Sequence, residues 1–233
     1  LAYLYRGDPV TYYDYWEILS PIEYLVSNEK KCTYLVNSKV ACSAIKASFF
    51  EQEFEDNYSV HNKVKEKQGK RYKRVKLGEE DYFSFTFVRN PFDRLVSCYV
   101  SKYQTDITKY KKTKNDFEEY LCGYLSQDDG FEAFVEKVAK IPPLLMDKHF
   151  IPQSKVVYTS NGDSRVDYIG RFETLEQDFL PIQKEYGLKP LKVFNATNKK
   201  DWKEYYNEHT AKLAYKIYKE DIKRFGYEDA YKE

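Results

Sequence analysis

The sequence predicts a single α/β domain in which a central, mostly parallel sheet is flanked by helices. Short apolar and β-branched runs alternate along the chain with segments of helical periodicity. Apolar residues make up 42% of the 233 residues and aromatic residues 18%, enough to build a core. No internal repeat and no linker rich in Pro, Gly or Ser divides the chain. We therefore expect one domain, with an N-terminal arm at 1–30 and a core at 31–227.

The first strand–loop–helix unit is expected just after the arm. Within the Tyr-rich arm we expect one short helix, from about Val10 to Leu19, which Ser20-Pro21 ends. Cys32 to Val36 is then a β-branched, apolar run and predicts a strand. After a loop of small and polar residues, helical spacing joins four apolar residues, namely Ile45, Phe49, Phe50 and Phe54.

A second unit of the same kind follows. Tyr82 to Val88 predicts a strand, after which Asn90 is a suitable N-cap and Pro91 a suitable first helical residue. The helix would carry an apolar face and a more polar one. The apolar face would hold Phe92, Leu95, Val96, Tyr99 and Tyr103, with Arg94, Ser97 and Ser101 nearer the other.

The rest of the chain continues the alternation of helices and strands. A helix is expected over Phe131 to Ala139, before Pro142-Pro143 interrupts the pattern. Strands are expected at Lys155 to Tyr158 and at Val166 to Ile169, and helices from Thr174 to near Gly187 and from about Asp201 to Phe225, where Gly226 ends the last one.

Charge and cysteine content exclude several classes of protein. The 38 Lys and Arg balance 37 Asp and Glu, so a strongly basic nucleic-acid binder and an acidic tail protein are excluded, and no nucleic-acid partner is expected. The four cysteines form no CxxC pair and indicate reduced thiols or at most an incidental bridge. No stretch reaches the roughly 18 apolar residues of a membrane span. Because the sequence begins at Leu1 rather than Met, an upstream anchor or leader stays open.

The loop after the first strand has the composition of an anion site. Ala41, Cys42, Ser43 and Ala44 are small enough for an anion to approach the backbone at the start of a helix, and Lys39 adds a charge. The GxxxxGK[ST] spacing of nucleoside triphosphatases is absent. On this evidence alone an ordinary strand-to-helix turn explains the loop equally well.

The second unit adds a guanidinium and a hydroxyl. Arg89 ends its strand and Ser97 lies about two turns into the next helix, a pair that suits a phosphate monoester. Ligands of open α/β sheets bind outside the carboxyl ends of the strands, so Arg89 and Lys39 are expected to face one crevice. The alternative is that Arg89 pairs with a structural carboxylate such as Asp93.

Asn37 to Lys46 resembles the 5′-phosphosulfate loop of sulfotransferases that use 3′-phosphoadenosine 5′-phosphosulfate (PAPS), and Phe87 to Tyr99 resembles their 3′-phosphate motif. The nearest resemblance is to carbohydrate sulfotransferases, both the Golgi enzymes and their bacterial relatives. Further matches follow in order, at His149 to Gln153, Asp167 to Asp178, Tyr218 to Ile222 and Phe225 to Tyr227. The series covers roughly residues 34 to 227. One departure is Ser38, where the family usually has Pro.

The resemblance implies a P-loop-like sulfotransferase fold, PAPS as donor, 3′-phosphoadenosine 5′-phosphate (PAP) as product, and no metal. Lys39 would neutralise the bridging oxygen, the 41–44 loop with the Ser43 hydroxyl would hold the 5′-phosphate, and Arg89 with Ser97 the 3′-phosphate. The complete donor-binding set would be Lys39, Val40, Ala41, Cys42, Ser43, Ala44, Lys46, Arg89, Ser97, Asn195, Thr197 and Lys199.

Transfer to a saccharide hydroxyl requires a base, for which the sequence offers three histidines. By position between the two nucleotide motifs, His61 is the first choice. His149 is the second, as base or acceptor-site residue, and His209 is expected to be a surface or packing residue. For an amine acceptor, a Glu would serve instead.

Two rival functions and the compartment are also weighed. A P-loop nucleotide phosphotransferase would need Mg²⁺ and Ser or Thr directly after the loop Lys, and Lys39-Val40 fails this test. A non-enzymatic glycan- or polyanion-binding module would use the basic run at 63–76, which otherwise borders the acceptor cleft or is simply solvated. The few cysteines favour a bacterial cytoplasmic protein over a Golgi enzyme.

Overall fold

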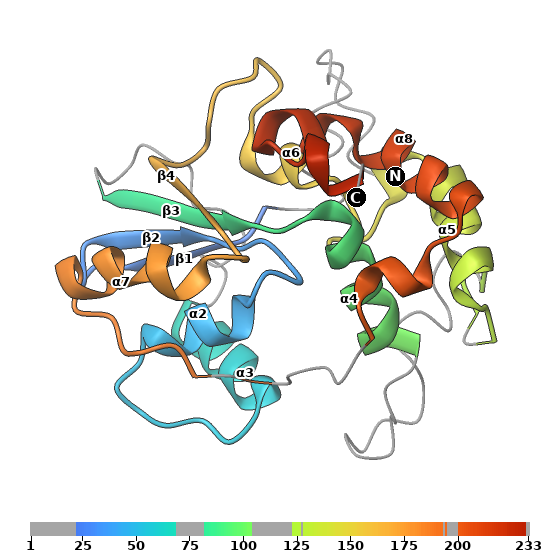
Figure 1. Ribbon diagram of the computed structural model, residues 1–233. Coiled ribbons are helices and arrows are strands. Elements are labelled where there is room, and N and C mark those ends of the chain that lie inside the picture. The colour runs from blue at the N-terminus through green and yellow to red at the C-terminus, as the bar shows by residue number, and fades with distance from the viewer. Residues whose placement is uncertain are drawn as a thin grey trace, which may run out of the picture.

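The computed structural model describes residues 22–68, 82–103, 123–126, 128–192, 194 and 200–231. Its centre is a sheet with the strand order β1-β2-β3-β4 (Figure 1). The strands are β1 (Tyr24–Ser27), β2 (Cys32–Leu35), β3 (Phe83–Val88) and β4 (Tyr168–Arg171). β1 pairs antiparallel with β2, whereas β2, β3 and β4 run parallel. The predicted α/β class with a mostly parallel sheet is therefore confirmed.

β3 is buried on both faces because its side chains alternate between two cores. Phe85 and Phe87 point into one core and Val88 into the other. The polar residues between them are buried but bonded, since Thr86 Oγ1 donates to the Leu35 carbonyl at 2.8 Å and Ser84 Oγ to Asp167 Oδ2 at 2.7 Å. A strand with satisfied polar groups and aromatic neighbours is stable at the centre of a sheet.

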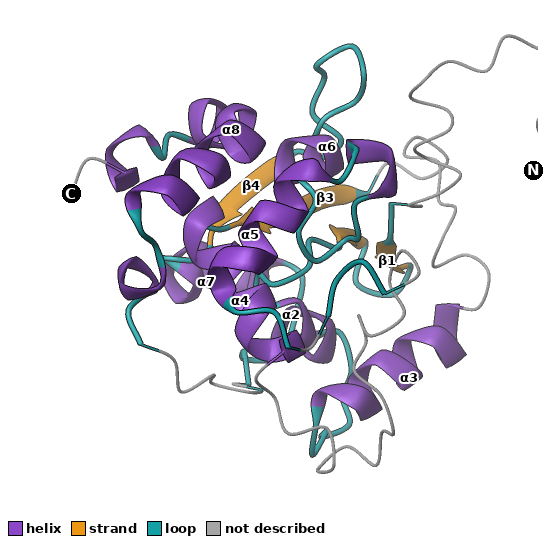
Figure 2. Cartoon of the chain, turned by 90° about the vertical axis from the view of Figure 1, so that its right-hand side faces the viewer, coloured by secondary structure: helices purple, strands orange, loops and turns teal. Residues whose placement is uncertain are grey.

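Helices cover both faces of the sheet. One face packs against α2 (Cys42–Ser48), α3 (Asn57–Gln68) and α7 (Leu175–Glu185), which lie together beneath the strands in Figure 1. The other core includes α4 (Pro91–Tyr103), α5 (Phe131–Lys140), α6 (Gln153–Val157) and α8 (Glu208–Phe225). In the view turned by 90°, α5 and α6 lie in front of β3 and β4, and α4 lies below these strands (Figure 2). Among the described residues, short 3-10 helices also occur at Pro143–Leu145, Trp202–Tyr205 and Glu228–Tyr231.

The start of α4 and the end of α8 lie where the sequence predicted, and for the predicted physical reasons. The Asn90 side chain accepts a hydrogen bond from the Phe92 N–H at 3.0 Å, and Pro91 is the first residue of α4. Gly226, with φ +67°, ends α8 in the left-handed conformation that Gly adopts readily. No described helix is both long and apolar enough to cross a membrane.

The predicted strand at Lys155 to Tyr158 is wrong, because residues Gln153–Val157 form α6. The local β-branched pattern is overridden by a tertiary contact, since Asp221 on α8 accepts the N–H groups of Gln153 and Ser154, both at 2.7 Å. A carboxylate that satisfies the first N–H groups of a segment favours a helix start there.

Other elements differ from the prediction in position. The antiparallel strand β1 lies in the segment expected to be the arm, so the sheet begins before residue 31. The strand expected from Val166 begins at Tyr168, and the helix expected to reach Phe54 ends at Ser48. The helix α3 was not predicted at all. The helix expected from Val10 to Leu19 lies outside the described residues.

Candidate active site

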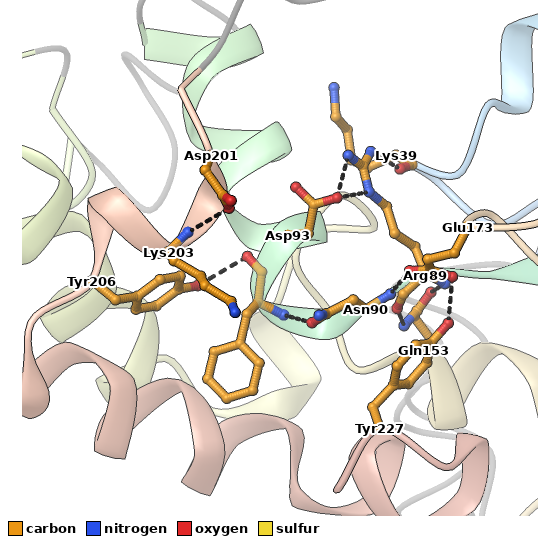
Figure 3. A network of polar contacts seen from close by, with 11 residues as sticks. Lys39, Arg89, Asn90, Asp93, Gln153, Glu173, Asp201, Lys203, Tyr206 and Tyr227 are labelled. Carbon is orange, nitrogen blue, oxygen red and sulfur yellow. Dashed lines mark hydrogen bonds and ion pairs between the residues drawn. The ribbon is translucent and has the colours of Figure 1, made fainter. Parts of the chain in front are cut away.

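The ends of three parallel strands meet at one edge of the sheet, as the sequence predicted for the loops after β2 and β3. The Asn37 amide, after β2, donates to the Phe87 carbonyl of β3 and to Gln153 Oε1, both at 3.0 Å. The Asn90 N–H, after β3, donates to Glu173 Oε1 after β4, at 2.7 Å (Figure 3). This is the edge at which open α/β sheets bind their ligands.

The loop before α2 has an unusual backbone. Lys39 and Ala41 have φ values of 67° and 50°, and neither is a glycine. The left-handed conformation of each such residue costs about 1–2 kcal/mol of conformational energy. Positive φ at alternate residues also turns successive N–H groups toward a common side, where they form an anion-binding concavity. Ala41, the N-cap residue of α2, offers no side-chain hydrogen bond to the start of the helix. The first N–H groups of that helix therefore point into the same region.

Two arginines hold this loop in place. Arg94, 1% exposed, donates to the carbonyls of Ser38 at 2.9 Å, Ile151 at 2.7 Å and Lys148 at 3.0 Å. Arg89 donates from Nη1 to the Lys39 carbonyl at 3.1 Å (Figure 3). The helical pattern placed Arg94 toward the polar side of α4, but the structure buries it as a clamp between the loop and the segment before α6. Sequence reasoning missed this role.

Lys39 is a partly buried cation at the centre of the site. Its Nζ donates to Ser101 Oγ at 2.6 Å. Burial, together with the neighbouring cations Lys102 and Arg89, lowers the pKa of Lys39 to about 8. A bound anion would favour the charged form and relieve this depression.

Arg89 is present at the strand end, but it is also paired, as the alternative interpretation held. Its Nε and Nη2 donate to Asp93 Oδ2 at 2.8 and 2.7 Å, and its guanidinium stacks over the Phe172 ring at 4.0 Å. With the bond to Lys39, these contacts use three of five N–H donors. Ser97 lies on α4 and is 6% exposed, and the described part of the chain shows no hydrogen bond from its hydroxyl.

His61 lies on α3 against the loop helix α2. Its Nε2 is 3.3 Å from Ser43 Oγ, and its Nδ1 is 3.3 Å from Nζ of the buried Lys46. Glu23 Oε2 lies 4.0 Å from the same Nζ. Burial, followed by the charges of Lys46 and Lys148, lowers the pKa of His61 to about 3, so the ring is neutral at physiological pH.

His149 forms a close pair with Asp147. The two side chains approach to 2.5 Å between Nδ1 and Oδ1, and the His149 backbone N–H donates to the same oxygen at 2.9 Å. Burial lowers the pKa of His149 to about 4; Asp147 opposes this shift, and Lys102 and Lys39 add to it. Burial alone would raise the pKa of Asp147, but its bonds from His149 hold it below the usual value.

The remaining sequence-predicted residues are a surface histidine and several residues that the structure does not describe. His209 lies at the surface, as expected, 2.9 Å from Glu136. Asn195, Thr197 and Lys199 lie outside the described residues, as does the basic run from residue 69 onward. Among the described residues, Cys32, Cys42 and Cys98 are free thiols, and no group of acidic, His or Cys side chains is placed to hold a metal.

Asp147 and Glu23 are site residues that the sequence analysis did not name. Asp147 had a weak signal, because it stands two residues before a candidate histidine within the Asp147-Lys148-His149 run. Glu23 had none, since it precedes a strand that was not predicted and reaches Lys46 only through the fold.

A sheet whose strand ends carry a small-residue loop, a lysine and an arginine has the arrangement found in α/β proteins that bind phosphorylated ligands. Comparison with known proteins narrows this class. The model of the Sulfotransferase family matches residues 23–228, so the chain belongs to that family. No solved structure matches the chain significantly.

Two curated relatives agree with the family match. Carbohydrate sulfotransferase 11 of Rattus norvegicus and of Mus musculus are each 29% identical to the chain over 171 residues. The aligned part is 64% of this chain and 47% of each relative, so the match spans about half the length of those proteins. The chain is thus a member of the Sulfotransferase family, and the proteins similar to it include carbohydrate sulfotransferases.

Proposed function

We propose that the chain transfers a sulfuryl group from PAPS to a saccharide hydroxyl by in-line displacement. The observation that carries the proposal is the meeting of the Lys39–Ala44 loop with Arg89 and with Ser101 of α4 at one sheet edge, in a chain of the Sulfotransferase family. The names of the curated relatives support a carbohydrate acceptor. The rest of the mechanism follows from what each side chain is placed to do.

The two phosphate ends of the donor would be held by different elements. The N–H groups from Ala41 to Ala44 and the Ser43 hydroxyl would bind the 5′-phosphate, because the start of α2 is uncapped. The two remaining donors of Arg89 and the Ser97 hydroxyl would bind the 3′-phosphate. Positioning of this kind supplies much of the rate of group transfer.

Lys39 would stabilise the leaving group. As the S–O bond to the 5′-phosphate breaks, negative charge grows on the bridging oxygen, and a fixed ammonium beside it lowers the barrier. The lowered pKa of Lys39 shows that burial and nearby cations disfavour its charge before an anion binds. A histidine near this centre, His61 or His149, would take the proton of the acceptor hydroxyl.

The donor assignment is tested by calorimetric titration with PAP beside ADP and AMP, each with and without Mg²⁺. We expect micromolar binding of PAP that requires the 3′-phosphate and does not respond to the metal. Ser97→Ala should weaken PAP binding about 10- to 100-fold, because a hydrogen bond to a charged group contributes about 1.5–3 kcal/mol. The same variant should leave AMP binding unchanged.

The matched control is Ser160→Ala, at an exposed serine far along the chain, which should bind PAP like the wild type. Equal affinity for PAP and AMP would contradict the donor assignment. Mg²⁺-dependent ADP binding would favour the phosphotransferase alternative, and salt-sensitive polyanion binding that tolerates the loss of Lys39 would favour a binding module.

A further inference from the structure

The two site histidines are held by partners of opposite hydrogen-bonding character. Asp147 faces Nδ1 of His149 at 2.5 Å, and an ionised carboxylate can only accept. The proton of the neutral His149 ring is therefore on Nδ1, and Nε2 is the proton-accepting nitrogen. The second bond to Asp147, from the His149 backbone N–H at 2.9 Å, fixes the carboxylate against the ring.

His61 has the reverse arrangement. Lys46 faces its Nδ1 at 3.3 Å. Burial lowers the pKa of Lys46, whereas Glu23, 4.0 Å from the same Nζ, acts against that shift and favours the ammonium form. An ammonium can only donate, so Nδ1 of His61 accepts and its ring proton is on Nε2. This N–H faces Ser43 Oγ at 3.3 Å, in the loop proposed to bind the 5′-phosphate.

The clamp residue Arg94 also ties the segment that carries His149 to the loop that carries Lys39. One guanidinium bonds the carbonyls of Ser38 and Lys148, the residues directly before Lys39 and His149. Lys39 is accordingly among the charges that lower the pKa of His149, whereas Lys46 leads the charges acting on His61. His149 thus lies on the Lys39 side of the site and His61 on the Ser43 side.

We propose that His149, oriented by Asp147, is the general base, and that His61 is an N–H donor to the phosphosulfate. The inference rests on the proposed function and reverses the order of preference that the resemblance suggested. The acceptor oxygen forms a bond to sulfur while the bond from sulfur to the bridging oxygen breaks. That electron pair stays on the 5′-phosphate of PAP, and the hydroxyl proton passes to Nε2 of His149.

The first test is the tautomer of each ring, measured by long-range ¹H–¹⁵N correlation on protein labelled at histidine. With three histidines in the chain, His61→Gln and His149→Gln assign the signals directly. At pH 7 we expect His149 to carry its proton on Nδ1 and His61 on Nε2. The opposite pair of tautomers, or a charged His149, would overturn the assignment without any reference to PAPS.

The second test is turnover of sulfur-labelled PAPS, with water and a panel of oligosaccharides as acceptors. Glutamine donates an N–H but does not take up a proton, so it should replace His61 and not His149. We expect His149→Gln and His149→Ala to lose about 10²- to 10⁴-fold in rate. His61→Gln should stay within about tenfold of the wild type, and His61→Ala should fall further.

Imidazole provides the control for the base. It should restore part of the activity of His149→Ala and none of that of His61→Ala. PAP affinity of the His149 variants should stay near the wild-type value, which separates this inference from the donor assignment. If wild-type protein binds PAP but His149→Gln turns over normally, this inference fails alone; if PAP does not bind, the proposed function fails.

Asp147 is a positioning residue, and a double-mutant cycle tests that role. Asp147→Asn should lower turnover at least about tenfold, because the amide can donate to Nδ1 and so allows the wrong tautomer. In the His149→Ala background the same change should have almost no effect, since the residue acts through the histidine. An equal loss in both backgrounds would show a purely structural role and contradict the assignment.

Discussion

Replacing Arg94 with Met tests whether one buried cation connects the two halves of the site. The guanidinium makes three hydrogen bonds, to the carbonyls of Ser38, Lys148 and Ile151, and is 1% exposed. At about 1.5–3 kcal/mol for each bond to a charged group, the gross loss is about 5–9 kcal/mol. The burial cost of the cation, several kcal/mol, is removed at the same time. We expect a net loss of about 3 kcal/mol.

Urea unfolding followed by circular dichroism measures the loss, and PAP calorimetry measures its effect on the site. We expect the urea midpoint to fall and PAP binding to weaken, because the Ser38 carbonyl is released and the strained loop is no longer fixed. Arg224→Met is the control, since Arg224 is 39% exposed and its contact with Glu220 is 3.6 Å long. An Arg94→Met protein with wild-type stability and PAP affinity would refute the clamp.

Two further predictions concern packing and pH. Gly170 pairs with Phe87 across β3 and β4, and a Cβ at this position would overlap the Phe87 ring. Gly170→Ala should therefore lower the free energy of unfolding, measured in urea, by about 1–3 kcal/mol. An unchanged urea midpoint would contradict the close packing. Because the pKa of His149 is lowered from 6.5 to about 4, the unfolded chain binds more protons between these values, and stability should fall as pH drops from 6.5 to 4. The total effect of this group is at most about 3 kcal/mol, and it should disappear in His149→Gln; equal pH slopes for both proteins would contradict the shift.

The fold could be predicted from the sequence where local signals and tertiary packing agree. β3 and α4 follow from an aromatic strand pattern and the Asn90-Pro91 start, and α8 from apolar periodicity ended by Gly226. The local signal failed at α6, where β-branched residues form a helix because Asp221, far along the chain, caps its start. No local pattern reports a cap that comes from another element.

The meeting of Lys39 and Arg89 at one sheet edge was predictable for a related reason. Its candidates lie in short segments just after strands, and the carboxyl ends of parallel strands share one edge, so Lys39 and Arg89 could be placed together before the structure was known. Arg94 and Glu23 could not be found in this way. Their partners are backbone carbonyls or a buried lysine on other elements, and such contacts leave no spacing in the sequence.

Several cations surround the Lys39–Ala44 loop, and not every one of them has a carboxylate partner among the described residues. Lys39 and Ala41 are held at positive φ, and Arg89 and Arg94 supply the hydrogen bonds that hold the loop next to them. These bonds bring further positive charge beside Lys39, and Arg89 contributes to the fall of its pKa to about 8. Backbone strain and repulsion between like charges both lower the stability of the folded protein when no ligand is bound. A polyanion at the loop would reverse the electrostatic part of that cost, so the free energy spent on preorganising the loop is recovered when such a ligand binds.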